Sequence, residues 1–210
     1  IEALKALGRE HSLPDGSAYT GIGMIDVTAL SKQYGLPGRQ VEIQALALGI
    51  VPVRYVRNRN TFSTADQITL LESRVAVVGL GGLGGWVAEI LARAGVGRLD
   101  LIDGDVFEDH NLNRQVFSQE ALVGDAKAQA AADRIAAINS SVEITLQRQY
   151  LDEKNAATLL GAASLIIDCL DNIATRFTLE ATAKSLGVPL ISAAVGGLSG
   201  HVITIFPADR

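Results

Sequence analysis

The sequence predicts an α/β protein, with a Rossmann-like, mostly parallel sheet that carries helices on both faces and a small helical N-terminal extension. Three observations lead to this prediction. From Arg74 onward, short apolar runs alternate with segments of helical periodicity. A glycine-rich loop, residues 79–84, joins the first apolar run to the first of these helices. Residues 1–53 lack this alternation. Strands that are apolar on both sides and separated by helices are typical of a parallel sheet covered on both faces.

We therefore expect two parts, residues 1–53 and residues 54–210. The first part contains turn patterns at Pro14-Asp15-Gly16 and Pro37-Gly38. Two helices are expected there, over residues 27–34 and 39–48. Asp26 precedes the first, where its carboxylate can accept hydrogen bonds from the free N–H groups of the opening turn.

The second part alternates strands and helices. Strands are expected over residues 75–78, 99–102, 142–146, 165–167 and 190–191. Helices are expected over residues 86–94, 126–138, 155–160 and 175–186. The last stretch, residues 200–206, is expected to pair antiparallel at an edge of the sheet.

Composition limits the class of protein. The 210 residues are 48% hydrophobic and 20% charged, which is typical of a globular chain. A net charge of −5 disfavours binding of the whole chain to nucleic acid or to an anionic membrane. The single cysteine, Cys169, excludes an internal disulfide and a four-cysteine zinc site. With no secretory signal and no apolar run of membrane-spanning length, we expect a cytoplasmic protein.

The loop Gly79-Leu80-Gly81-Gly82-Leu83-Gly84 has the spacing of a phosphate-binding turn. Gly79 permits the tight turn, and Gly81 and Gly82 let the backbone approach phosphate. Gly84 lets the helix pack close to the strand. The helix that follows offers free N–H groups to anionic oxygens.

Asp103 ends the second strand, about 20 residues beyond the loop, where an acidic side chain accepts hydrogen bonds from ribose hydroxyls. The alternative is an aspartate that only caps the turn Asp103-Gly104-Asp105. Up to this point the pattern fits an NAD(P), FAD or ATP site equally well.

Three further features favour ATP. Arg114 offers a planar fork to phosphate oxygens and Lys127 a compact point charge. The segment Asp168-Cys169-Leu170-Asp171-Asn172 follows the strand over residues 165–167, which places a carboxylate at the same crevice. Mg²⁺ takes one or two carboxylates together with phosphate oxygens, so one aspartate of this segment is sufficient as a protein ligand.

These motifs give the chain its resemblance to a known family. The matching strings are Arg54-Tyr55-Val56-Arg57-Asn58, Gly79 to Gly84, Ala94-Gly95-Val96-Gly97, Asp103-Gly104-Asp105, Asn111-Leu112-Asn113-Arg114-Gln115, Gly124 with Lys127, Asp168-Cys169-Leu170-Asp171-Asn172 with Thr175-Arg176, and Pro189-Leu190. They run in family order over about three quarters of the chain. The chain resembles the ThiF/MoeB/HesA family, the bacterial relatives of ubiquitin-activating enzymes.

The resemblance implies an ATP- and Mg²⁺-dependent adenylyltransferase, with residues 54–210 as its ATP-binding domain. The expected substrate is the C-terminal glycine of a ubiquitin-like sulfur-carrier protein of the ThiS/MoaD type. By resemblance, Gly82 contacts the nucleotide, Asp103 holds the ribose, and Asp171 binds Mg²⁺ beside Asn172. The same resemblance places Asn111, Arg114, Gln115 and Lys127 around the phosphates.

Arg57 resembles the arginine that reaches into the active site of the partner subunit. This implies a homodimer in which Arg57 acts in trans. The alternative is a solvated arginine in a basic run with Arg54 and Arg59.

Two family features are missing from this sequence. The paired Cys-x-x-Cys zinc motifs of many relatives do not occur, and neither does a thioester-forming cysteine in a later loop. Cys169 stands between two carboxylates, which disfavours a thiolate, so we interpret it as a small core residue. Either the thiol lies beyond Arg210, or the reaction stops at the adenylate.

Residues 27–48 could also form a helix-turn-helix. Residues 1–53 carry four basic and five acidic side chains, which disfavours DNA binding. We expect instead that this arm packs on the partner subunit or on the carrier protein. Its apolar positions would otherwise be exposed: Val41, Ile43, Leu46 and Leu48.

Three other functions stay open. The enzyme could adenylate another acid, such as a peptide terminus or a tRNA-base carboxylate. An NAD(P)-binding oxidoreductase or sensor would explain the glycine loop and Asp103 but not Arg114, Lys127 or Asp171. A non-catalytic module could have kept the nucleotide site and lost the chemistry.

Overall fold

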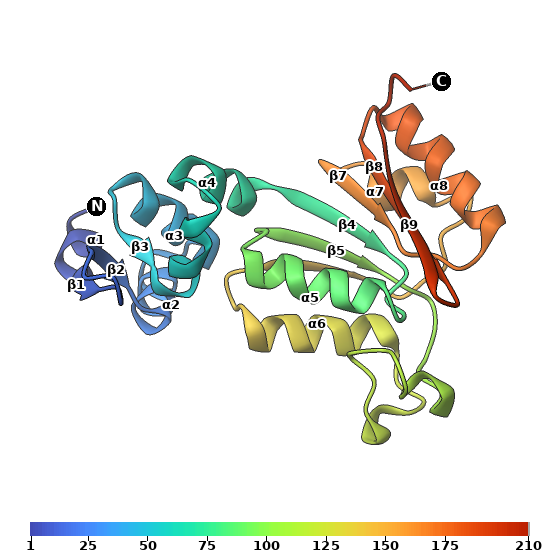
Figure 1. The fold of residues 1–210 in the computed structure, drawn as a ribbon, viewed down its shortest axis with the longest axis horizontal. Helices are drawn as coiled ribbons and strands as arrows, with labels where there is room; N and C mark the ends of the chain where they lie inside the picture. Colours follow the sequence, from blue (N-terminus) through green and yellow to red (C-terminus); the bar gives the residue numbers. More distant parts are fainter. Residues whose placement is uncertain (210) are drawn as a thin grey trace.

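The computed structural model describes residues 1–209 and confirms the predicted α/β fold (Figure 1). Six strands form one sheet in the order β6-β5-β4-β7-β8-β9, parallel except for the antiparallel pair β8 and β9. The strands are β4 (Arg74–Val78), β5 (Arg98–Ile102), β6 (Glu143–Gln147), β7 (Leu165–Asp168), β8 (Leu190–Gly196) and β9 (Ser199–Ile205). The helices between them are α5 (Gly84–Ala94), α6 (Lys127–Ile138), α7 (Ala156–Leu160) and α8 (Ile173–Leu186).

The two faces of the sheet belong to two hydrophobic cores. In β4, Val75 and Val77 point to the core shared with α5 and α6, and Ala76 and Val78 point to the core shared with α7 and α8. Successive strand residues face opposite sides, so an unbroken apolar run can serve both cores at once.

The N-terminal part contains both expected helices and, in addition, a small sheet that the sequence did not predict. It comprises α1 (Glu2–Leu7), β1 (Arg9–Ser12), β2 (Ala18–Ile22), α2 (Met24–Tyr34), α3 (Gly38–Ala47) and β3 (Val51–Pro52). Strand β1 pairs antiparallel with β2, and β2 pairs in parallel with β3. A 3-10 helix, η1 (Val53–Asn60), and α4 (Thr64–Glu72) lead from there to β4.

The predicted cap at Asp26 is wrong. Helix α2 begins one turn earlier than expected, with Gly23 at the N-cap position and no side-chain cap. Asp26 therefore lies inside the first helical turn, where it faces the positive end of the helix without closing it.

The apolar side chains that we expected to be exposed without a partner are covered within the chain, and packing of the arm on another protein stays a prediction. Val41 lies in the core of the N-terminal part, and Leu46 packs with Tyr55 and Leu71. Ile43 lies against that second cluster and Leu48 against the first. The chain itself covers these positions.

Polar groups join the N-terminal part to the α/β sheet. Arg39 pairs with Glu143 at 3.0 Å, and the fully buried Glu42 lies 3.5 Å from the Arg54 guanidinium. The Tyr55 hydroxyl donates to Glu42 at 3.2 Å. We call this buried region the junction; its members come from α3, η1, the α6–β6 segment and β6.

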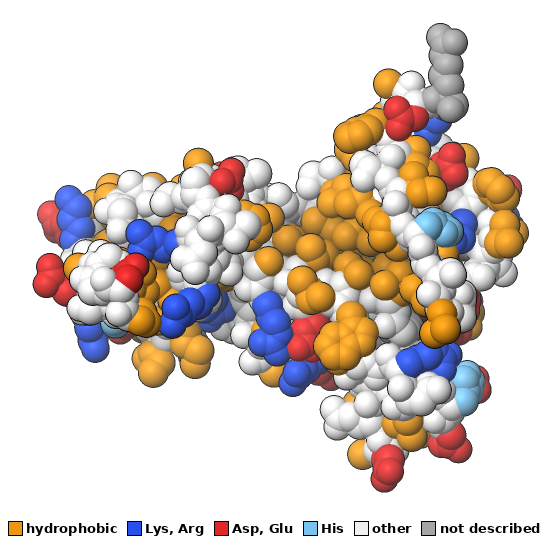
Figure 2. All heavy atoms as spheres, in the orientation of Figure 1, with side chains coloured by type: hydrophobic (Ala, Val, Ile, Leu, Met, Phe, Trp, Pro, Cys, Tyr) orange, Lys and Arg blue, Asp and Glu red, His pale blue; other side chains and the backbone are white. Residues whose placement is uncertain are grey.

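Among the described residues, no helix is both long enough and apolar enough to span a membrane. In the space-filling view, hydrophobic side chains gather over the sheet between β4 and β9 (Figure 2). In this region α5 and α6 do not cover the sheet (Figure 1).

Candidate functional site

A cavity of about 790 Å³ opens at the carboxyl ends of β4, β5, β7 and β8. This is where open parallel sheets bind their ligands, because the chain turns away from the sheet there on both sides. Nine predicted site residues line it: Gly79, Gly81, Gly82, Asp103, Arg114, Gln115, Lys127, Asp171 and Asn172. They come from segments up to about ninety residues apart in the sequence, and the sheet order brings them together.

The glycine loop has the geometry that its sequence predicts. Gly79 has φ of +87°, a left-handed conformation that side chains rarely adopt. A Cβ on Gly84 would lie 1.7 Å from the Gly79 carbonyl oxygen, so helix α5 starts in direct contact with the end of β4. No side chain caps the N-terminus of α5, and of its first N–H groups that of Gly85 donates to the Gly81 carbonyl at 3.1 Å, which leaves its neighbours available to a ligand.

Asp103 holds the loop in place and faces the cavity. Its two carboxylate oxygens accept hydrogen bonds from the backbone N–H groups of Leu80 and Asp105, each at 2.7 Å. Burial raises the pKa of Asp103 above its ordinary value, against the opposing effect of these two bonds. Asp103 therefore does cap the turn Asp103-Gly104-Asp105. Each of its carboxylate oxygens still has a lone pair that can accept a hydrogen bond from a ribose hydroxyl.

Two cations face the cavity from different directions. Lys127 is buried at the first residue of α6, and its ammonium pairs with Asp105 at 3.0 Å. The aliphatic stem of Arg114 lies over Gly82, where a Cβ would contact it at 3.4 Å. The exposed guanidinium of Arg114 donates to the carbonyl of His110 at 2.8 Å. Both cations can reach an anion at the glycine loop.

The residues present fit a nucleotide with its metal ion. Gln115 is buried, and its side-chain oxygen has no hydrogen-bond partner within residues 1–209. A buried acceptor without a partner costs about 1–3 kcal/mol unless a ligand or water satisfies it. Asp171 is exposed at the cavity wall, and within the described chain its carboxylate forms no hydrogen bond or ion pair, so it is available to a cation held by phosphate oxygens.

Asp168, three residues before Asp171, has the opposite character. It is buried, and its carboxylate accepts from the Leu170 N–H at 3.0 Å, from Arg176 at 2.9 Å and from the Ser192 hydroxyl at 2.8 Å. Asp168 therefore anchors the ends of β7 and β8, whereas Asp171 faces the cavity.

Cys169 behaves as the sequence predicts. Burial, and then the negative charge of Asp168, raise the pKa of its thiol to about 12. The side chain packs at the edge of the core beneath α5. It is a thiol without nucleophilic character at neutral pH.

Three predicted residues do not line the cavity. Gly84 lies behind it, at the base of α5. Asn111 is buried, and its side-chain oxygen accepts from the Glu108 N–H at 3.0 Å, so it shapes the loop that carries Arg114. Arg57 is exposed on η1, away from the residues that line the cavity.

The sequence interpretation missed several residues of the wall. Asp105 and Tyr150 line the cavity beside Lys127, and Arg176 lines it while its guanidinium pairs with Asp168 at 2.9 Å. Asp105 stands in a motif that was recognised, but its pairing with Lys127 was not predicted. Tyr150 follows β6 in a segment without a recognisable pattern, and only the position of β6 beside β5 brings it to the site.

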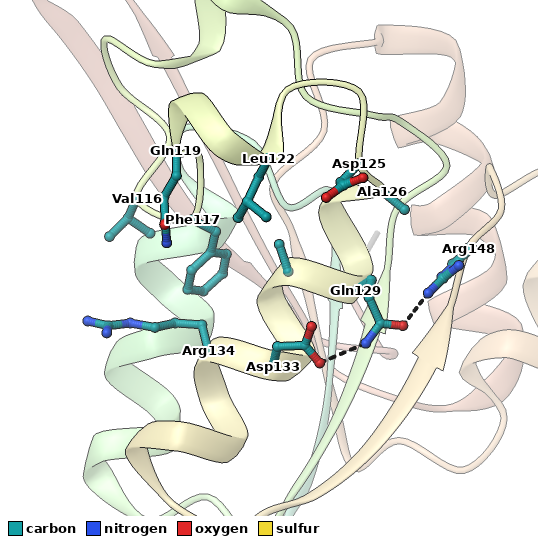
Figure 3. Close-up of a pocket in the computed structure, with 11 residues that line it drawn as sticks. Val116, Phe117, Gln119, Leu122, Asp125, Ala126, Gln129, Asp133, Arg134 and Arg148 are labelled. Atoms are coloured by element: carbon teal, nitrogen blue, oxygen red, sulfur yellow. Dashed lines mark hydrogen bonds between the residues drawn. The ribbon is translucent and has the colours of Figure 1, made fainter.

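A second cavity, of about 650 Å³, lies between α6 and the preceding loop, residues 116–126 (Figure 3). None of the predicted site residues lines it. Four of its polar side chains have partners: Gln129 donates to Asp133 at 2.7 Å and accepts from Arg148, and Arg134 pairs with Glu89. Gln119 and Asp125 are exposed, so within residues 1–209 this cavity holds no buried polar atom without a partner, unlike the first.

Comparison with known proteins gives matches over the same part of the chain. The model of the ThiF family matches residues 55–210. Molybdopterin-synthase adenylyltransferase of Salmonella typhimurium is 41% identical over 145 residues, which is 69% of this chain and 58% of that protein. The mouse adenylyltransferase and sulfurtransferase MOCS3 is 41% identical over 143 residues, 68% of this chain and 31% of its own length.

Among solved structures, the E. coli tRNA N6-threonylcarbamoyladenosine dehydratase TcdA in complex with ATP is similar, with a TM-score of 0.67 and 31% identity. The similarity covers 70% of this chain and 61% of that one. The chain thus spans little more than half the length of these bacterial relatives. The match of the family model to residues 55–210, which include the glycine loop and the whole cavity, shows that the chain belongs to the ThiF family.

Proposed function

We propose that this chain is an ATP-dependent adenylyltransferase that activates a carboxylate, acting in the cytoplasm. One observation carries the proposal. A single cavity combines a glycine loop, a carboxylate at the ribose position, two cations and an unpaired Asp171. The relatives named above are adenylyltransferases, and TcdA is a structural neighbour with ATP bound, which supports the same nucleotide here.

In the proposed reaction a carboxylate oxygen attacks the α-phosphorus of ATP. The new P–O bond forms as the bond from the α-phosphorus to the bridging oxygen breaks, and pyrophosphate carries away the electron pair. The backbone N–H groups of the glycine loop hold the phosphates in line. Arg114 and Lys127 offset the negative charge that develops on the leaving pyrophosphate.

Asp171 is the proposed protein ligand of Mg²⁺. When bound, the ion would neutralise phosphate charge and orient the leaving group. The exposed position of Asp171 in the wall of the same cavity as the glycine loop suits a ligand shared with phosphate oxygens. Asn172 caps α8 through a hydrogen bond from the Thr175 N–H at 3.1 Å, which fixes the turn that presents Asp171.

For the acid substrate we propose the C-terminal glycine of a ubiquitin-like sulfur-carrier protein. The names of the two relatives, one acting on molybdopterin synthase and one a sulfurtransferase, support this class. The name of TcdA, a tRNA-modifying enzyme, supports the alternative that a carboxylate on a tRNA base is activated. Adenylate formation with each class of acid in turn would decide between them.

We further propose a homodimer with Arg57 acting in trans. Asn58, the next residue, donates to the Ala94 carbonyl at 3.0 Å, so Arg57 lies at the C-terminal end of α5. The glycine loop lies at the other end, about 16 Å away for an eleven-residue helix. Two copies of α5 paired antiparallel about a two-fold axis would bring Arg57 to the partner's loop. Trp86 and Ile90 are exposed on α5 and suit such a contact.

The function is tested by ATP–pyrophosphate exchange, with thermal unfolding in ATP plus Mg²⁺, ATP plus EDTA, and NAD(H). A ligand at about 100 times its dissociation constant adds roughly 2.7 kcal/mol, an easily measured shift. We expect stabilisation by ATP that depends on Mg²⁺. Stabilisation by NAD(H) alone would overturn the proposal.

Replacing Asp171 with Ala should abolish exchange while leaving the ligand-free melting temperature unchanged, because its carboxylate makes no bond within residues 1–209. Asp26→Asn, a carboxylate on α2 far from the cavity, is the control and should exchange normally. Full ATP–pyrophosphate exchange by the Asp171→Ala variant would contradict a role of Asp171 in the reaction.

The trans role is tested by mixing two inactive variants, Arg57→Ala and Asp171→Ala. If subunits exchange, half of the dimers are mixed and each contains one intact site, so activity should recover to about one quarter of wild type. Mixtures that stay inactive although mixed dimers form would show that Arg57 does not act across the interface.

A further inference from the structure

Tyr150 lies at the rim of the cavity and is fixed at both ends of its side chain. Its hydroxyl donates to one carboxylate oxygen of Asp105 at 2.6 Å. Its ring lies against Gly104, where a Cβ would come within 2.8 Å of the ring carbon Cγ. The absence of a side chain at Gly104 is therefore what lets the ring reach Asp105. The residue is nevertheless 69% exposed, so it covers little hydrophobic surface in the ligand-free protein.

Asp105 connects Tyr150 to Lys127. Its second carboxylate oxygen accepts from the Lys127 ammonium at 3.0 Å, and its backbone carbonyl accepts from the Lys127 N–H, also at 3.0 Å. Burial acts to raise the pKa of Asp105, but the Tyr150 hydroxyl and the Lys127 charge outweigh it and lower the pKa. The carboxylate is thus an anion with one oxygen assigned to each neighbour.

Because each oxygen of Asp105 has a different partner, the number of Lys127 N–H donors left for a ligand depends on Tyr150. An ammonium group has three N–H donors. While Tyr150 occupies one oxygen of Asp105, the carboxylate meets the ammonium through its other oxygen alone, and the remaining donors can turn to phosphate. Without the hydroxyl, the carboxylate can rotate to engage the ammonium with both oxygens, and more of its negative charge faces the phosphates.

We propose that Tyr150 is a positioning residue for nucleotide binding, which holds Asp105 so that the Lys127 ammonium stays available to the phosphate chain of ATP. The inference rests on the proposed function, since it takes the cavity to be the ATP site. Tyr150 should therefore affect binding of the ATP phosphates and not binding of the base or the ribose. The hydroxyl is exposed in the ligand-free protein, where water can replace it, and becomes irreplaceable once the nucleotide excludes water.

The test compares wild type with Tyr150→Phe, which removes one oxygen atom and keeps the ring. We expect the dissociation constant of ATP to rise about five-fold and that of adenosine, which has no phosphate, to stay unchanged. In ATP–pyrophosphate exchange the KM for ATP should rise while kcat stays within about two-fold. Tyr34→Phe, an exposed tyrosine on α2, is the matched control and should leave both constants unchanged.

A second variant tests the route through Asp105. In an Asp105→Asn background the neutral amide no longer needs the tyrosine, so adding Tyr150→Phe should change ATP binding less than two-fold. Thermal unfolding of each ligand-free variant checks that it is folded.

The outcomes separate the two proposals. Wild type that fails to bind ATP overturns the proposed function and the inference with it. Wild type that binds ATP, with Tyr150→Phe equally tight, overturns the inference alone. Equal weakening of ATP and adenosine would make Tyr150 a nucleoside contact and would also overturn it.

Discussion

Two buried amide side chains, Asn139 at the junction and Gln115 at the cavity, differ in how far the protein satisfies them. Asn139 donates to the Tyr55 hydroxyl at 2.9 Å and to the Ala92 carbonyl at 3.0 Å, and its oxygen accepts from Arg54 and from the Ser141 N–H. Gln115 is about as buried, yet its oxygen has no partner among residues 1–209.

The difference distinguishes a structural polar group from one that awaits a ligand. A buried polar group normally has its partners within the fold, because leaving one unpaired costs stability. At the junction Asn139 follows that rule, and the one oxygen of Glu42 that accepts no hydrogen bond lies 3.5 Å from the Arg54 guanidinium. The cavity departs from the rule at Gln115, which indicates where an external partner belongs. The predictions below test this distinction, beginning with the largest expected effect.

Asn139→Ala should cost roughly 3 kcal/mol of unfolding free energy, because several buried groups at the junction lose their partner. For a protein of this size the melting temperature should fall by roughly 6–12 °C. ATP affinity of the folded protein should not change. Thermal unfolding with Asn60→Ala, an exposed asparagine on η1, as control measures the effect. A loss no larger than that of the control would mean that the junction amide does not stabilise the fold.

Gln115→Leu should do the opposite of Asn139→Ala: it should weaken ATP binding and leave stability nearly unchanged. The apolar side chain of similar size removes an unpaired acceptor, so the unfolding free energy should stay within about 1 kcal/mol of wild type. The dissociation constant of ATP should rise about ten-fold, as expected when a ligand loses one buried hydrogen bond. Gln119→Leu, outside this cavity, is the control. Unchanged ATP binding would mean that the unpaired oxygen of Gln115 is satisfied by water and not by ATP.

The smallest expected effect concerns Cys169, and it is seen in the reactivity of the thiol and in the pH dependence of stability. The folded thiol has a pKa of about 12 against an ordinary 9.0, so at pH 9 it is almost wholly protonated. Alkylation by iodoacetamide at that pH should be on the order of 100-fold slower in the native than in the denatured protein. Because the folded pKa is the higher one, the unfolding free energy should fall as the pH rises from 9 towards 12. Rapid alkylation of the native protein would contradict a half-buried thiol that is neutral at pH 9.

The sequence predicted the α/β domain well because its strands are apolar enough to be recognised alone. Residues 75–78 and 165–167 differ by at most one residue at either end from β4 and β7. The strands of the N-terminal part were missed, because β1 is polar and mostly exposed and β3 has only two residues. Helix α4 was missed although Ser63 and Asp66 form a capping box, a pattern that is visible in the sequence.

The site divides in the same way. Residues in local motifs, such as the glycine loop and Asp103, line the cavity as predicted. Asn111 lies in a matching motif but supports the loop from behind, since a motif does not say which of its side chains faces a ligand. Tyr150 could not be predicted, because its place depends on the pairing of β5 with β6 and on the missing side chain at Gly104.

The Ala94 carbonyl, at the end of α5, accepts two amide groups, from Asn58 and from Gln67 in α4, each at 3.0 Å. These bonds tie the backbone beside Arg57 to a helix whose other end is the glycine loop. An arginine on a free loop would lose backbone entropy for every residue that becomes ordered on contact, about 1–2 kcal/mol each. Arg57 has only its own rotamers to lose, roughly 2 kcal/mol. Its attachment to α5 therefore preserves most of the binding energy of any contact that it makes.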